Sequence, residues 1–299
     1  MKYQIFIGDL LYNLNKKIEK NEEINQSLEQ IAQAIFKSWF IDFEPTRAKL
    51  AAKQNGTDPE RAAMATLSGK MLDGLDQISP ATQQQLQETA ALFPDTLVDS
   101  ELGEIPVGWE ASALGNHFNV VMGQSPKGDT YNEEGIGTLF FQGRRDFGFR
   151  FPTPRVYTTA PKRLAQAGDT LISVRAPVGD KNMALCECCL GRGVGGIRHK
   201  SGARSFTYAF ISHIEKSLSD SGSNGTVFNS INKNELNAVP FISPGTEMVS
   251  HYEKLVHPID QKIEICSIEI SNLEILRDTL LPRLLSGEIN LSSDLMREI

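Results

Sequence analysis

The sequence predicts an α+β protein in which one mixed α/β domain is flanked by long N- and C-terminal α-helices. An apolar repeat of alternating four- and three-residue steps lies near each end of the 299-residue chain, and the central stretch is rich in glycine, proline and short β-prone runs. A repeat of this kind is typical of a helix that lies along another helix, so the terminal helices are expected to pair as a coiled-coil-like spacer. The predicted parts are an N-terminal helical region (1–45), a polar helical connector (46–100), the α/β domain (101–245) and a C-terminal helical region (246–299).

Composition limits the class of protein. A chain of this length has room for about two domains, and its 40% hydrophobic and 22% charged residues are typical of a globular protein in water. No apolar run approaches the roughly 20 residues needed to cross a bilayer, and the first residues lack the pattern of a signal peptide. Four cysteines, three of them bunched, do not make a disulfide framework. We therefore expect a cytoplasmic protein with no membrane association.

The N-terminal helical region is predicted from a long seam. Its members are Ile7, Leu11, Leu14, Ile18, Asn21, Asn25, Leu28, Ala32 and Ile35. The two asparagines are polar interruptions, which can fix register and partner number at some cost in stability. The alternative is an ordinary amphipathic helix of a core. The aromatic cluster around Trp39 is expected to pack against a globular neighbour, and Pro45 is expected to stop the helix.

In the connector, Asp58 and Ser79 each precede a proline, an arrangement typical of a helix N-cap. They predict helices over Arg61–Met71 and Ala81–Leu92. The α/β domain follows, with the expected strands Phe118–Met122, Thr138–Gln142, Asp169–Arg175, Met183–Glu187 and Val194–Arg198, and the expected helices Phe206–Ser217 and Asn232–Ala238.

The C-terminal region returns to helix from Thr246 to Leu285. Its apolar positions are Met248, Tyr252, Leu255, Ile259, Ile263, Cys266, Ile270, Leu273, Leu276 and Leu280. Pro258 is expected to begin a fresh helix after a break at His257, and that helix would extend about 35 Å to Leu281. Each terminal helix is expected to bury its seam against the other, in the same chain or in a second copy.

Charge is distributed unevenly along the chain. The net charge is −7, yet the 63 residues from Gln142 to Arg204 hold twelve basic and four acidic residues, a local charge of +8. Nine of the twelve are arginine, which suits forked contacts with phosphate or guanine. A polyanion responds to the local field, so this region indicates nucleic-acid binding. The alternative is a solvated basic surface.

Catalytic motifs are not evident in the sequence. The run Gly191–Gly196 lacks the following helix of a phosphate-binding loop, and it favours backbone approached closely by a ligand or another strand. Cys186, Cys188 and Cys189 lack a second ligand pair for zinc and are expected to be thiols buried in a strand. A basic domain without a catalytic constellation favours binding over catalysis, and no cofactor is expected in this chain.

Several segments resemble the specificity subunits of type I restriction-modification systems. Three segments of this chain resemble the central conserved region of that family: Ile35–Pro45 with Arg47, Thr89–Asp95, and Ser100–Trp109. The family's target recognition domains resemble Gly168–Gly179, Arg192-Gly193 and Gly222–Ile231, and its distal conserved region resembles Leu276–Ile289. These matches occur in the same order as in the family and extend over nearly the whole chain.

The resemblance implies a non-catalytic subunit that reads double-stranded DNA. By this resemblance, a full-length member contains two recognition domains that alternate with two helical regions. This chain resembles a half-length form with one recognition domain. Pairing two copies head to tail would give a homodimer that reads an interrupted palindrome. The resemblance also implies docking of a modification (methyltransferase) subunit, which would bind S-adenosylmethionine and methylate adenine, and of a restriction (translocase/endonuclease) subunit. The connector is longer than the family's usual link.

Base reading is expected from long polar side chains. The first candidates are Gln142, Arg144 and Arg145, with Arg175 and Arg192 next, because glutamine can pair with adenine and arginine with guanine. Ser223, Asn224 and Asn229 suit phosphate or groove contacts. The remaining candidates for DNA binding are Lys127, Arg150, Arg198 and Lys200. Two alternatives remain: a stand-alone or decoy DNA-binding protein without a methyltransferase partner, and an enzyme whose site lies in the glycine-rich strands.

Overall fold

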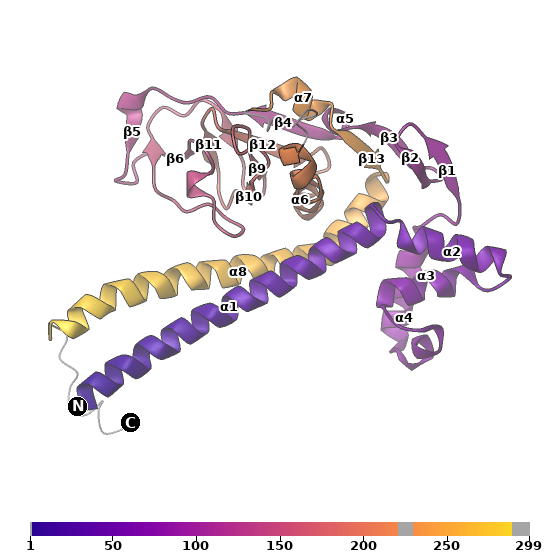
Figure 1. The fold of residues 1–299 in the computed structure, drawn as a ribbon, viewed down its shortest axis with the longest axis horizontal. Coiled ribbons are helices and arrows are strands. Elements are labelled where there is room, and N and C mark those ends of the chain that lie inside the picture. Colours follow the sequence, from indigo (N-terminus) through magenta and orange to yellow (C-terminus); the bar gives the residue numbers. More distant parts are fainter. Residues whose placement is uncertain (1, 221–229, 289–299) are drawn as a thin grey trace. The chain divides into compact units, whose positions relative to one another are not determined.

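The computed structural model describes residues 2–220 and 230–288 (Figure 1). The candidates Ser223, Asn224 and Asn229 lie outside this part of the chain. The chain divides into two compact units, a helical unit of residues up to Ile31 and from Pro258 onward, and a domain unit of Ala32–His257. Within the described residues, no helix is both long enough and apolar enough to span a membrane.

The helical unit contains parts of the two longest helices, α1 (Lys2–Phe40) and α8 (Thr246–Leu285), which lie side by side and antiparallel (Figure 1). Asn15 meets Arg277 at 3.2 Å, Asn21 donates to Glu269 at 2.9 Å, and Asn25 donates to Ser267 at 3.1 Å. The two helices therefore pair within one chain, which is the first of the two arrangements expected from the sequence.

The seam of α1 is confirmed, because each of its members is buried or half-buried. Asn21 and Asn25 are 1% and 2% exposed. The hydrogen bond from Asn21 holds the pKa of the Glu269 carboxyl below its ordinary value. The seam of α8 is only partly confirmed: Ile263 and Cys266 are fully buried, whereas the predicted members Leu255 and Leu276 are exposed.

Two helix boundaries differ from the expectation. The α8 helix continues through Pro258, so the predicted break at His257 is wrong. A proline removes one backbone hydrogen bond, and here the turns on both sides are held by buried residues, Val256 before it and Ile263 after it. The α1 helix ends at Phe40, and Pro45 lies instead in the first turn of a helix that was not predicted, α2 (Glu44–Gln54).

The connector folds into a group of short helices: α2, α3 (Pro59–Ser68), η1 (Leu72–Gln77) and α4 (Pro80–Ala91). The predicted N-caps are confirmed, because Asp58 accepts from the backbone of Glu60 at 2.9 Å and Ser79 accepts from Thr82 at 3.3 Å. The side chain of Lys49 is buried and donates to Glu60 at 2.6 Å and to the Phe93 carbonyl at 2.9 Å. Ala52, Ala63, Leu75 and Ala90 of these helices are buried as well.

Two sheets form the centre of the domain unit. The first is antiparallel with strand order β10-β9-β12-β4, built from β4 (Phe118–Met122), β9 (Thr170–Ser173), β10 (Lys181–Met183) and β12 (Val194–His199). The second has order β5-β7-β6-β11-β8, from β5 (Tyr131–Asn132), β6 (Thr138–Phe141), β7 (Tyr157–Thr158), β8 (Leu164–Ala165) and β11 (Cys188–Leu190), with β6 and β11 parallel.

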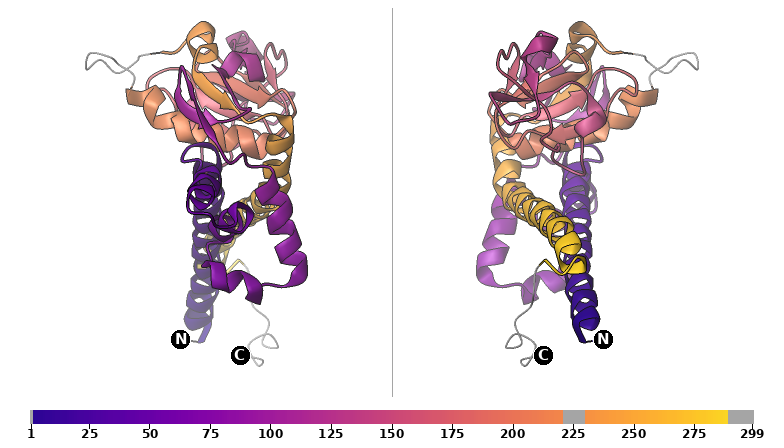
Figure 2. Two further views of the ribbon diagram at one scale, coloured as in Figure 1. Left: turned by 90° about the vertical axis from the view of Figure 1, so that its right-hand side faces the viewer. Right: turned by 90° about the vertical axis from the view of Figure 1, so that its left-hand side faces the viewer.

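Smaller elements complete the domain unit. A hairpin joins β1 (Leu97–Ser100) to β2 (Gly103–Pro106), and β3 (Glu110–Ala113) pairs antiparallel with the distant strand β13 (Pro240–Ser243). The short helices are α5 (Leu114–His117), η2 (Gly128–Thr130), η3 (Arg144–Asp146) and α7 (Lys233–Asn237). The long helix α6 (Arg204–Asp220) lies against β9, β10 and β12 of the first sheet (Figure 2).

Most predicted elements of the domain are confirmed, and one strand is wrong. The strand Phe118–Met122 has the predicted bounds, and the helices predicted from Phe206 and Asn232 form as α6 and α7. The predicted strand Met183–Glu187 is mostly the loop between β10 and β11. Cys188 and Cys189 are buried in β11 as expected, whereas Cys186 is exposed outside it.

The core between the sheets is small-residue-rich and closely packed. It contains Phe141, Ala165, Leu171, Ala184, Cys188, Leu190 and Val194. Space beside Gly196 of β12 is tight, since a Cβ atom there would lie 3.1 Å from Leu190 Cδ1 and 3.5 Å from Ala165 Cβ. Small residues therefore let the two sheets approach each other.

An aromatic cluster joins helix ends to the sheets inside the domain unit. Phe40 contacts Phe206 of α6 and Tyr252 of α8 with ring centroids 5.2 and 5.3 Å apart. Trp39 lies 5.2 Å from Phe93 of the connector. The expectation that the Trp39 segment packs against a globular neighbour is confirmed. The Glu253 carboxylate adds a charged cap, because it accepts from the first backbone amides of α6 at 2.9 and 3.2 Å.

The cost in stability of a polar residue in the α1 seam can be tested at Asn25. The amide oxygen of Asn25 is buried and accepts no hydrogen bond within the described residues, while Ser267 keeps its bond to the Ile263 carbonyl. Asn25→Leu is therefore expected to raise the free energy of unfolding by about 1 kcal/mol. Thermal unfolding followed by far-ultraviolet circular dichroism measures the change. Asn25→Ala is the control without added apolar volume, and a lower melting temperature for Asn25→Leu would contradict the interpretation.

Candidate nucleic-acid interface

Several loops meet at one edge of the two sheets. The antiparallel register pairs Met122 with Gly195 and Ser173 with Val194, so β4 and β9 end where β12 begins. The parallel register pairs Phe141 with Leu190, so β6 and β11 also end together. The segments that follow β4, β6, β9 and β11 therefore lie at a common edge of the double sheet.

The loop Gly191–Gly193 is the junction of these segments. Its backbone amides donate to the Phe141 carbonyl at 2.8 Å and the Gln142 carbonyl at 3.1 Å, and the Gly193 carbonyl accepts from Val174 at 3.0 Å. A Cβ atom at Gly191 would lie 2.8 Å from Gln142 Cα, and one at Gly193 would lie 2.6 Å from the Gln142 carbonyl oxygen. The interpretation of these glycines as backbone approached closely by another strand is confirmed.

The junction gathers long polar side chains on the surface, which we call the basic rim: Gln124, Gln142, Arg163, Arg175 and Arg192. All five are exposed. Gln124 donates through its backbone to the Leu190 carbonyl at 2.8 Å, and the Arg163 carbonyl accepts from the Leu190 amide at 2.8 Å. Arg175 forms a backbone bridge with Ser230, the residue next to the candidate Asn229.

Three of the sequence candidates, Gln142, Arg175 and Arg192, thus lie together, and two rim residues were missed. Arg163 precedes β8, which pairs antiparallel with β11. That pairing brings Arg163 beside Gly191. A strand of two residues is too short for the sequence to indicate which strand it pairs with. Lys127 is exposed in the loop after β4, two residues beyond Ser125, whose hydroxyl accepts from the Arg192 amide at 3.3 Å.

Ion pairing within the domain reduces the free positive charge. Arg144 pairs with Asp180 and Arg198 with Asp169, while Arg155 pairs with Asp146 at 2.8 Å and Lys181 with Glu215 at 2.6 Å. By contrast, Arg145, Arg163, Arg175 and Arg192 make no ion pair within the part of the chain that the structure describes. The unpaired arginines therefore concentrate at the rim and in η3.

Three candidates lie away from the rim. Arg150 is 2% exposed and its guanidinium lies 3.4 Å from the ring centroid of Tyr208, so its expected role in DNA contact is corrected to one inside the domain. Arg198 and Lys200 lie at the opposite end of β12. Lys200 donates to the Asn116 carbonyl at 2.6 Å there. Arg192 and Arg198 are close in the sequence, but they lie at opposite ends of β12. The sequence alone did not indicate which basic residues share one end of the strand.

Burial shifts the pKa values of two groups in this domain, Cys188 and His199. Burial raises the pKa of the Cys188 thiol to about 12, which keeps it protonated at neutral pH. Burial also lowers the pKa of His199 to about 4, so its ring stays neutral. Within residues 2–220 and 230–288, no group of three or more His, Cys, Asp or Glu side chains is arranged to hold a metal ion.

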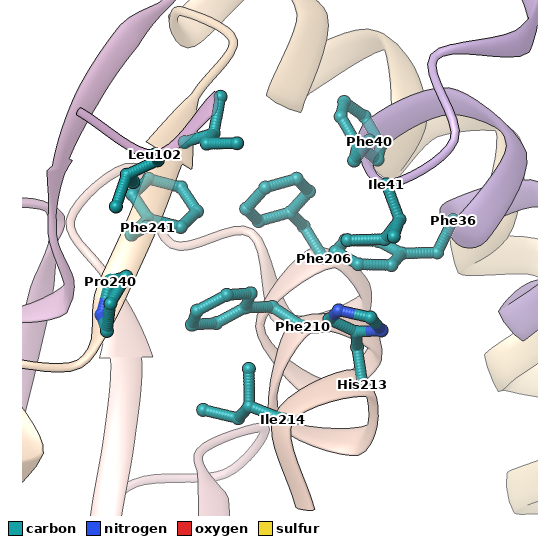
Figure 3. A pocket seen from close by; sticks show the side chains of 11 residues that line it. Phe36, Phe40, Ile41, Leu102, Phe206, Phe210, His213, Ile214, Pro240 and Phe241 are labelled. Atoms are coloured by element: carbon teal, nitrogen blue, oxygen red, sulfur yellow. The ribbon is translucent and has the colours of Figure 1, made fainter. Parts of the chain in front are cut away.

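An apolar hollow of about 260 Å³ lies beside the aromatic cluster (Figure 3). The ring of Phe206 lies between Phe241 of β13 and Phe36 of α1 in this view, and Phe210 and His213 close the lower side. Partial burial lowers the pKa of His213. The hollow offers no unpaired cation, so the basic rim is the better candidate for contact with a polyanion.

Comparisons with known proteins find relatives in the family that the sequence segments resemble. Over 228 residues, 75% of this chain, the sequence is 34% identical to a protein of Methanocaldococcus jannaschii assigned as the specificity subunit of the type I restriction enzyme MjaX. Over 305 aligned residues, 95% of this chain, it is 33% identical to the HindI type I restriction enzyme specificity subunit of Haemophilus influenzae. The alignments cover 53% and 66% of those relatives, so the chain spans between half and two thirds of their length.

A solved structure shares the fold. The crystal structure of the type I restriction-modification S subunit from M. genitalium aligns with a TM-score of 0.55 over 94% of this chain and 60% of that one, at 14% sequence identity. No family model matches the chain.

The junction makes a specific demand at Gly193. Gly193→Ala places a methyl group 2.6 Å from the Gln142 carbonyl oxygen and 3.2 Å from Gly143 Cα. We expect the variant to lose about 1–3 kcal/mol of unfolding free energy, measured by urea unfolding with tryptophan fluorescence. Gly128→Ala is the matched control, because a Cβ atom at Gly128 meets nothing within 4 Å. Equal stability of the two variants would show that the junction is not closely packed.

Proposed function

Because the chain belongs to the family of type I restriction-modification specificity subunits, we propose that it recognises a DNA sequence through the basic rim. The supporting observation is the convergence of exposed glutamines and unpaired arginines at one edge of a rigid double sheet. A rigid support holds such side chains in place, and that favours reading of base edges over diffuse attraction.

The chemistry of the rim suits the major groove. A glutamine amide can bond adenine through two atoms, and an arginine guanidinium can fork onto guanine. Gln142 is held by its backbone next to Gly193, so its side chain projects from a fixed position. Some of the three arginines Arg163, Arg175 and Arg192 would contact base edges, and the others would contact phosphates. Contacts with phosphate would make the affinity fall with salt.

Catalysis would belong to partner subunits. We propose that a modification subunit docks on this chain, carries S-adenosylmethionine and methylates adenine in the target, and that a restriction subunit joins the complex. The chain itself would supply recognition and spacing. Its contribution to spacing would come from α1 and α8, which pair within the helical unit.

A second copy would supply a second reader. The described residues contain one double-sheet domain, and α8 carries apolar side chains on an outer face of the helical unit. Ile265, Ile268 and Ile275 are 58%, 45% and 63% exposed. Their spacing of three and seven residues places them along one side of the helix, as in a seam that lacks its partner. We propose that two copies associate through this face and read an interrupted palindrome.

The proposal of base reading predicts a loss that depends on sequence. Arg163→Ala combined with Arg192→Ala should weaken binding to a duplex selected from a random library by about 10-fold or more, with a smaller loss on unselected DNA. Fluorescence anisotropy at fixed salt measures both. Lys200→Ala at the opposite end of β12 is the control and should bind nearly as the parent does. Equal losses on both duplexes would reduce the two arginines to phosphate contacts.

The proposal of self-association predicts a mass near twice 33.0 kDa in light scattering. Changing Ile265, Ile268 and Ile275 together to serine should give a monomer, because the exposed apolar face is removed. Met71→Ser, at an 86% exposed position of the connector, is the control and should stay dimeric. A monomeric parent chain that binds DNA would defeat self-association and leave recognition standing. Copurification with a modification subunit would separate the family role from a stand-alone DNA-binding protein.

A further inference from the structure

One exposed aromatic ring lies beside the recognition loops and has no role in the core. Phe149 is 53% exposed in the segment between β6 and β7. Burial of such a ring against a partner would gain free energy by removing apolar surface from water. The ring is therefore a candidate contact, provided that the backbone holds it in place.

The backbone on both sides of Phe149 is fixed. The buried Asn182 side chain accepts from the Gly148 amide at 3.0 Å and donates to the Gly148 carbonyl at 2.9 Å. The Arg150 carbonyl accepts from the Met183 amide at 2.8 Å, and the Arg150 side chain lies over Tyr208. Phe149 is thus exposed on a braced segment rather than on a loose loop.

The surroundings of the ring are charged and polar. Phe149 lines a hollow of about 490 Å³ together with Arg144, Arg145, Asp180, Lys181 and Glu215. Arg145 also lines a second hollow of about 240 Å³ with Gln142, a member of the basic rim. The surface from the rim to Phe149 is therefore continuous through Arg145.

We propose that Phe149 contacts duplex DNA beside the base-reading rim, with its ring against thymine methyl groups or the apolar edges of bases and sugars while Arg145 contacts phosphate. This inference rests on the proposed function of the rim. Phenylalanine is one of the side chains that make apolar contacts with thymine, and a rigidly held ring can also wedge against a base step. The braced segment limits the ordering needed on binding.

The unpaired Arg145 beside the ring favours DNA over a protein partner, whereas Arg144 and Lys181 are neutralised by Asp180 and Glu215. Protein interfaces centre on contiguous apolar area, whereas the other residues that line the Phe149 hollow are mostly charged. Between residues 142 and 163, no other large hydrophobic residue is strongly exposed. A single strongly exposed ring beside the unpaired Arg145 fits a surface that offers alternating apolar and anionic groups, which a DNA groove does.

Salt dependence separates the ring from the arginine beside it. Phe149→Ala should lower the affinity for a duplex selected from a random library by about tenfold and leave the slope of log affinity against log salt unchanged. Arg145→Ala should lower the affinity and also reduce that slope by about one. Ile136→Ala is the matched control, because Ile136 is 59% exposed near the opposite end of β6. Phe149→Leu should give an intermediate loss.

Three outcomes decide the inference. A loss for Phe149→Ala with an unchanged slope, and none for Ile136→Ala, supports it. Unchanged affinity of Phe149→Ala for DNA overturns it, and weaker assembly of that variant with a modification subunit would then assign the ring to a protein interface. Failure of the parent chain to bind any duplex overturns the proposed function as well, which distinguishes that result from a failure at Phe149 alone. Circular dichroism of each variant excludes unfolding as the cause.

Discussion

The aromatic cluster in the domain unit is the interaction on which the placement of the loops at the basic rim depends. Phe40 and Phe36 from the end of α1, Tyr252 from the start of α8 and Phe206 from α6 all lie within ring contact of one another. Aromatic pairs of this kind add to the free energy of burial, and they leave few alternative arrangements. The hydroxyl of Tyr252 also donates to the Ala32 carbonyl at 3.2 Å. The first sheet rests on α6, so the cluster connects the ends of both long helices to the strands that carry the loops.

Backbone geometry, rather than side-chain chemistry, assembles the basic rim. Gly191 and Gly193 let the segments after β6 and β9 approach within hydrogen-bonding distance, and a methyl group at either position would collide with Gln142. The arginines need only project from segments that are already fixed. This arrangement allows the exposed side chains to vary without loss of the fold, because the packing demand falls on glycines and on the buried strands.

Local patterns in the sequence predicted much of the fold, and nonlocal relations explain what was missed. The strand Phe118–Met122 and the N-caps at Asp58 and Ser79 follow from short-range propensity, and the α1 seam follows from periodicity. Arg150 looked like any other arginine of a basic segment until Tyr208, 58 positions away, covered its guanidinium. Arg163 joined the rim only through the pairing of β8 with β11. Strand register and burial are properties of the folded chain, so single-sequence reasoning could name the basic region but could not say which arginines share one edge.

The distribution of ion pairs explains how an acidic chain can present a site for a polyanion. Arg144, Arg155, Lys181 and Arg198 are each paired with a carboxylate of the same domain, which cancels much of their field. The arginines at the rim lack such partners among the described residues. Screening limits the reach of an exposed charge to about 10 Å at 0.1 M salt, so a phosphate at the rim would respond to these arginines and hardly to the net charge of −7. Selective neutralisation therefore concentrates the positive field, because attraction for an anion remains at the rim and is weakened along the flanks of the domain.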